Sequence, residues 1–87
     1  MTLNFPNESR SYDERRDLIR FWGHDSALEI SFFVEAGALQ KMNPGMKNGE
    51  AACLEAFDSG RELIQEVARK LYSKGRKDMY FLEAADF

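Results

Sequence analysis

Histidine and cysteine are scarce in this sequence, and their scarcity narrows the chemistry that the protein can perform. His24 is the only histidine and Cys53 the only cysteine among 87 residues. A single cysteine cannot form an internal disulfide, and one residue of each type is too few for a structural zinc site. A glycine-rich phosphate-binding motif is also lacking, since Gly45 and Gly49 are not followed by the Lys-Ser/Thr pair of such loops. We therefore expect no metal and no cofactor.

Long hydrophobic runs are missing as well. The longest uncharged, largely apolar stretch covers residues 30–34, far short of the roughly 20 residues that a membrane span needs. Polar and charged residues interrupt the first ten positions, which is not the pattern of a secretory signal. The sequence predicts no contact with a membrane and a cytoplasmic location.

An excess of positive charge is absent too. The 12 basic and 15 acidic residues give a net charge of −3, which argues against a strong affinity of the whole molecule for polyanions. The 44% hydrophobic and 31% charged residues are typical of a globular protein. A chain of this length rarely supports two cores, so we expect a single domain over residues 1–87.

Alternating apolar and polar residues predict three strands in the first part of the chain. A short strand covers the opening TLNF, and a hairpin joins DLIRFWG to LEISFFVE through the turn GHDSA. Successive strand side chains point to opposite faces, so Ile19 and Phe21 lie on one face of the sheet and Trp22 on the other. By the same rule Phe32 and Phe33 lie on opposite faces.

The rest of the chain has helical patterns followed by one more strand. EAGALQKM predicts a short helix over residues 35–42 that ends at NPG, and apolar residues at steps of three and four predict a long helix over residues 50–73. Asn48 and Gly75 are its expected caps, and we interpret Gly60 as a point of close packing. DMYFLEA predicts a last strand whose facing the pattern leaves open. We expect a two-layer α+β fold of order β-β-β-α-α-β, with an antiparallel sheet of three or four strands packed on the long helix and the short helix nearby.

The order of these segments resembles a known family. NFP, SYD, IRFWG, LEISFFVEAGAL, CLEAFDSGRELIQEVARKLYSKG and YFLEAADF follow one another as in the small uncharacterised bacterial proteins called domain of unknown function 1488. The likeness covers almost the whole chain. It implies a compact α+β fold in a bacterial cytoplasm and supplies no catalytic residues.

Two constellations are candidates for catalysis, and we interpret both as structural. His24 stands beside Asp25, and a carboxylate can orient an imidazole for acid–base work, but adjacent residues of a turn seldom point together. Cys53 lies on the apolar stripe of the long helix, where a thiol is usually an inert core residue. We expect no catalytic residue, and an enzyme using His24 and Asp25 is the least favoured hypothesis.

A basic segment at residues 69–77 supports a second hypothesis, a weak nucleic-acid-binding or accessory regulatory protein. Five cations gather here around Tyr72: Arg69, Lys70, Lys74, Arg76 and Lys77. The end of a helix attracts cations through its dipole, which accounts for the first three without a ligand.

Trp22 and Phe33 support the leading hypothesis. Because they face away from the long helix, they are either covered by residues 35–42 and the N-terminal segment or exposed as a patch for a partner. We favour cover, since a helix directly after the strand can fold back over them. An exposed patch would make the protein a small non-enzymatic interaction module that associates with itself, as a homodimer, or with another bacterial protein.

Overall fold

The computed structural model describes residues 3–6, 8–74, 77 and 79–87, which form a mixed α+β fold. The predicted fold class is confirmed. The elements follow in the order β1 (Arg10–Asp13), β2 (Leu18–Asp25), β3 (Leu28–Glu35), α1 (Ala36–Met42), α2 (Glu50–Ser59), α3 (Arg61–Ser73), β4 (Met79–Leu82) and a short 3-10 helix η1 (Ala84–Asp86).

The four strands lie side by side in the order β1-β2-β3-β4. β1, β2 and β3 pair antiparallel, and the predicted hairpin is confirmed as β2 and β3. β4 pairs parallel to β3, so the sheet is mixed where the pattern favoured an antiparallel one. The reason is topological: the three helices carry the chain back along the sheet, and β4 therefore starts at the same end as β3.

The predicted first strand at TLNF is wrong. Asn4 makes only an isolated bridge with His24, through two backbone hydrogen bonds of 2.8 Å, and the first strand forms further on, at Arg10–Asp13. Leu3 and Phe5 pack over the sheet instead of lengthening it. Gly23 makes room for them, because a Cβ at this position would lie 2.9 Å from Leu3 Cδ1.

The predicted long helix is divided at Gly60 into α2 and α3. The backbone hydrogen bonds continue through the break, since Gly60 donates to the Ala56 carbonyl and accepts from Ile64. A Cβ at Gly60 would lie 3.3 Å from Met42 Cε, so the close neighbour there is the side chain of α1. The cap before α2 is Gly49, with φ of 105°, and the expected Asn48 cap is wrong. Gly75 lies outside the described residues.

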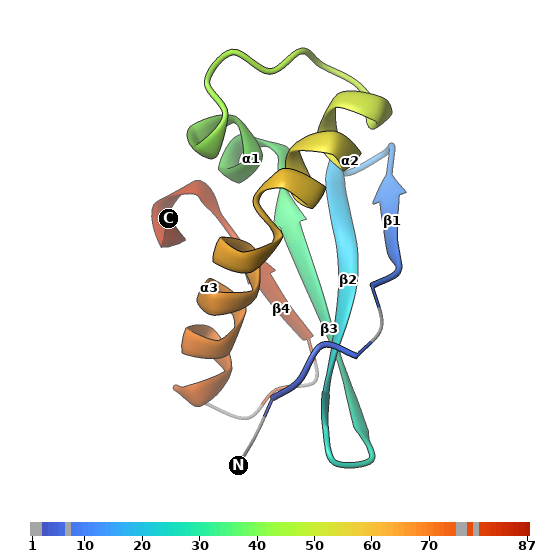
Figure 1. The fold of residues 1–87 in the computed structure, drawn as a ribbon, viewed down its shortest axis with the longest axis vertical. Coiled ribbons are helices and arrows are strands. Elements are labelled where there is room, and N and C mark those ends of the chain that lie inside the picture. Colours follow the sequence, from blue (N-terminus) through green and yellow to red (C-terminus); the bar gives the residue numbers. More distant parts are fainter. Residues whose placement is uncertain (1–2, 7, 75–76, 78) are drawn as a thin grey trace.

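The main core lies between one face of the sheet and all three helices. Figure 1 shows α2 and α3 in front of the strands, α1 beside the upper end of β3, and the N-terminal segment crossing in front of the lower part of the sheet. Phe32 stands at the centre, with ring centroids 5.3 Å from Phe21 and 5.5 Å from Tyr80. Phe21 continues the cluster to Phe57 of α2 at 5.2 Å. Alternate residues of β2, β3 and β4 thus bury their side chains under the helices.

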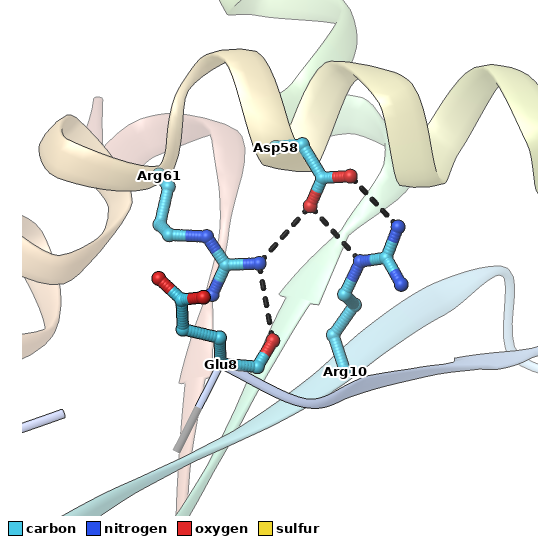
Figure 2. Close-up of polar contacts among 4 residues, drawn as sticks. All are labelled: Glu8, Arg10, Asp58 and Arg61. Atoms are coloured by element: carbon cyan, nitrogen blue, oxygen red, sulfur yellow. Dashed lines mark hydrogen bonds and ion pairs between the residues drawn. The ribbon is translucent and has the colours of Figure 1, made fainter. Parts of the chain in front are cut away.

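A polar cluster joins edge strand β1 to the junction of α2 and α3 (Figure 2). Arg10 donates two hydrogen bonds to the Asp58 carboxylate, at 2.9 and 2.7 Å. Arg61 donates to the same carboxylate at 3.0 Å and to the Glu8 carbonyl at 3.2 Å. The Arg10 hydrogen bond is the main cause that holds the pKa of Asp58 below its ordinary value of 3.8. One carboxylate therefore ties the first strand to the helical layer.

The Asp58 cluster predicts an acid-sensitive contribution to stability. A lowered pKa in the folded state stabilises the fold fully above pH 3.8, and this stabilisation is lost as the pH falls through the lowered pKa. Because the Asp58 side chain is 46% exposed, we expect Asp58→Asn to reduce the free energy of unfolding at pH 7 by only about 0.5–1 kcal/mol. Urea unfolding at pH 7 and pH 3 measures the difference, which should shrink at pH 3. An equal loss at both pH values, or the same effect from Glu55→Gln on the same helix, would contradict this role.

Candidate functional site: an open aromatic face

The face of the sheet that points away from the helices has an aromatic centre. Strand alternation and register bring five side chains together there, from the three strands β2, β3 and β4. We call this surface the aromatic face and define it by Arg20, Trp22, Phe33, Met79 and Phe81. The predicted facing of Trp22 and Phe33 agrees with this register. Neither ring belongs to the main core cluster.

Phe33 and Phe81 form a stacked pair across β3 and β4. Their ring centroids lie 4.9 Å apart and the planes are inclined by 17°. Phe33 is buried, whereas Phe81 and its neighbour Met79 are 42% and 47% exposed. Large apolar side chains at the surface of a small protein are individually ordinary, but adjacent ones on a flat sheet form a patch of the kind that partners bind.

Arg20 lies over two of the three rings of this surface, those of Trp22 and Phe33. Its guanidinium carbon is 5.0 Å from the Trp22 ring centroid and 5.8 Å from that of Phe33. Arg20 also donates a hydrogen bond of 3.0 Å to Ser31 Oγ on the neighbouring strand. The cation therefore lies within cation–π distance of both rings while the Arg20 residue remains exposed.

The favoured prediction that residues 35–42 cover Trp22 and Phe33 is wrong. α1 buries Ala38 and Leu39 in the main core, on the same side of the sheet as α2 and α3. Leu3 and Phe5 of the N-terminal segment pack against that core as well. Among the described residues, therefore, no helix lies over the aromatic face.

An open depression of about 610 Å³ adjoins this surface beside β1. Phe33, Met79 and Arg20 line it together with Tyr12 and residues of the β1–β2 turn. The Tyr12 hydroxyl donates to Asp17 Oδ1 at 2.6 Å, and this hydrogen bond is the main cause that raises the pKa of Tyr12 to about 12. The phenol therefore stays protonated at neutral pH, and the Tyr12 side chain packs against the main core.

His24 and Asp25 do not form an acid–base pair. Both belong to β2, not to the turn, and adjacent strand residues point to opposite faces. The Asp25 carboxylate accepts a hydrogen bond of 2.6 Å from the Tyr72 hydroxyl, which ties β2 to α3. Leu28, the first residue of β3, is exposed because it stands at the tip of the hairpin.

Cys53 is a core residue of α2. Its side chain is 2% exposed, and burial is the main cause that raises the pKa of its thiol. A raised pKa reduces the thiolate fraction, so the geometry does not support a nucleophile here.

The described side chains of the predicted basic segment make different contacts and do not form one surface. Arg69 lies 5.1 Å from the Phe5 ring centroid and donates to the Leu3 carbonyl at 3.4 Å. Lys70 forms an exposed ion pair of 3.7 Å with Glu66 of the same helix. Lys74 and Lys77 line a hollow beside β4 and Phe81. Arg76 lies outside the described residues.

Within residues 3–6, 8–74, 77 and 79–87, no three histidine, cysteine or acidic residues come together as a metal site would require. No helix in this described part is long and apolar enough to cross a membrane.

The fold and its open face define a small α+β protein with helices on one side of a four-stranded sheet. A sequence profile of the family described as protein of unknown function (DUF1488) matches residues 3–83, and the chain belongs to this family. A crystal structure of a DUF1488 protein of unknown function from Shewanella loihica PV-4 has the same fold, with a TM-score of 0.81 and 20% identity over 94% of each chain. No curated protein matches the chain.

The contact of Arg20 with Trp22 gives a spectroscopic prediction, because Trp22 is the only tryptophan of the chain. We expect Arg20→Ala to raise the quenching of Trp22 fluorescence by acrylamide and to lower the free energy of unfolding by about 0.5–1 kcal/mol. Arg15→Ala, on the adjoining turn, should leave both quantities unchanged. Equal quenching of Arg20→Ala and the wild type would show that Arg20 does not cover the indole.

Proposed function

We propose that this protein is a small non-enzymatic interaction module that binds another protein through its aromatic face. One observation carries the proposal: the helices and the N-terminal segment pack on one side of the sheet, while Trp22, Met79 and Phe81 remain accessible on the other. A sheet face of this composition is ordinarily buried, because apolar area gains about 25 cal/mol per Å² when it leaves water.

The geometry of this surface suits protein binding in two further respects. Its side chains stand on a hydrogen-bonded sheet, so little conformational freedom is lost when a partner docks. Tryptophan and arginine are also the residue types most often found as energetic anchors of interfaces, and Trp22 and Arg20 lie in contact.

Nucleic-acid binding has less support. A basic binding surface requires cations that converge on one track of phosphates. Arg69 and Lys70 instead engage the protein itself, and the net charge of the chain is −3.

The proposal predicts that loss of the aromatic face abolishes partner binding. Tagged wild type, Trp22→Ser and Met79→Ser proteins are used to capture proteins from a lysate of the source cells, with quantification by mass spectrometry. We expect one set of proteins to bind the wild type. The captured amount of these proteins should fall at least about tenfold with both variants, which corresponds to 1.4 kcal/mol of binding free energy.

Leu63→Ser is the matched control, because Leu63 on α3 has the same 47% exposure as Met79 and lies outside the aromatic face. This variant should retain the full set of partners. Capture that is equal for all four proteins would refute the proposal. Unfolding curves of the variants show whether any loss reflects a damaged fold.

A further inference from the structure

A hollow of about 370 Å³ lies between the end of α3 and β4, beside the aromatic face. Two lysines and three apolar side chains are among its described lining residues, Leu71, Lys74, Lys77, Met79, Tyr80 and Phe81. We call it the cationic hollow. Met79 and Phe81 also belong to the aromatic face, so a partner that docks on this face reaches the hollow. Its volume is near the lower end of those of ligand sites and suits one or two side chains of a partner.

The described lining of the cationic hollow carries charge of one sign. Lys74 and Lys77 are exposed, and neither forms an ion pair with an acidic residue of the described part of the chain. No acidic residue is among the described lining residues. Arg76 and Asp78 lie outside the described residues, and the sequence from 74 to 78 holds three basic residues and one acidic residue. Within a chain of net charge −3, this is a local excess of positive charge.

The dipole of α3 accounts for only one of these two lysines. The carbonyl end of a helix attracts cations, which explains Lys74 at the end of α3. Lys77 lies beyond the helix and is positioned by a different contact, because its backbone amide donates a hydrogen bond of 2.9 Å to the Tyr80 hydroxyl. The depression on the other side of the aromatic face has mixed charge, since Asp13 and Glu14 line it together with three arginines. The unbalanced positive charge is therefore on the β4 side.

We propose that the cationic hollow selects protein partners in which an acidic side chain stands beside large apolar ones. The apolar side chains of such a segment pack on Met79 and Phe81, and its carboxylate binds Lys74 and Lys77. The inference rests on the proposed function and names the chemistry of its partner. Exposed ion pairs contribute little affinity but much specificity, so the apolar contacts determine whether a segment binds and the lysines determine which segment.

Selection from a displayed library of random peptides tests this chemistry with a defined probe. The immobilised whole chain is used as wild type, as Lys74→Gln/Lys77→Gln and as the control Lys47→Gln/Lys70→Gln, which removes the same charge from exposed lysines outside the hollow. Peptides selected by the wild type and the control should combine aspartate or glutamate with large apolar residues. Those selected by Lys74→Gln/Lys77→Gln should keep the apolar residues and lose the acidic ones.

Affinity measurements with one selected acidic peptide quantify the effect. The peptide should bind Lys74→Gln/Lys77→Gln about threefold to tenfold more weakly than the wild type, because two exposed ion pairs are lost. The same peptide with amides in place of its carboxylates should bind both proteins equally. Added salt should weaken the binding of the acidic peptide to the wild type and have little effect on its binding to the variant. Unfolding curves show whether each variant retains the fold.

Selected peptides without acidic residues, or acidic peptides that bind Lys74→Gln/Lys77→Gln as tightly as the wild type, would overturn this inference and leave the proposed function intact. Trp22→Ser changes the aromatic face outside the hollow and should reduce the recovery of all peptides. Undiminished recovery with Trp22→Ser, or no selected peptide with the wild type, would contradict the proposed function and this inference together. A short single-stranded DNA that binds more tightly than the peptides, through the same lysines, would assign the hollow to phosphate groups and overturn the inference.

Discussion

The packing of all helices against one face of the sheet is the constraint on which the rest of this structure depends. Strand geometry sends alternate side chains to opposite faces, so burying Phe21, Phe32 and Tyr80 under the helices necessarily turns Trp22, Phe33 and Phe81 away from them. Among the described residues of this 87-residue chain, all three α-helices belong to this single layer, so no α-helix remains to cover the other face of the sheet. The aromatic face is therefore a direct consequence of how the core is made.

Two polar contacts, one at the junction of α2 and α3 and one near the end of α3, hold the helical layer in this position. Asp58 binds Arg10 of β1 near the junction of α2 and α3, and Tyr72 near the end of α3 binds Asp25 at the end of β2. Between them the aromatic cluster from Phe57 through Phe21 and Phe32 to Tyr80 fills the core. The N-terminal segment completes the cover at Gly23, where a larger residue would collide with Leu3.

The features that the sequence predicted depend on local periodicity. Alternation placed Ile19 and Phe21 under the helices and Trp22 and Phe33 opposite them, and the apolar stripe located the helical residues 50–73. The features that it missed depend on distant contacts. β1 has few apolar residues and is held by Arg10 and Asp58, 48 residues apart, while the division at Gly60 brings Met42 of α1 close.

Only part of the site could be predicted from the sequence: the facing of Trp22 and Phe33, but not that of Phe81. Aromatic residues at successive positions, Tyr80 and Phe81, satisfy either facing of β4, so periodicity could not assign Phe81 to the aromatic face. The position of α1 was also beyond local reasoning, because a helix that follows a strand can turn to either side of the sheet. The hydrogen bond of 3.0 Å from the Ala36 amide to the Asp17 carbonyl is one of the distant contacts at the start of α1.

Solvent accessibility of individual protons tests the one-sided packing most directly. In an NMR measurement with a soluble gadolinium chelate, the account predicts strong relaxation enhancement for the Met79 methyl and the Phe81 ring, intermediate enhancement for the Trp22 indole, and almost none for Ile19, Phe32 and Ile64. Protection of Met79 and Phe81 equal to that of Ile64, in a dilute monomer, would show that another part of the chain covers this face and would contradict the account.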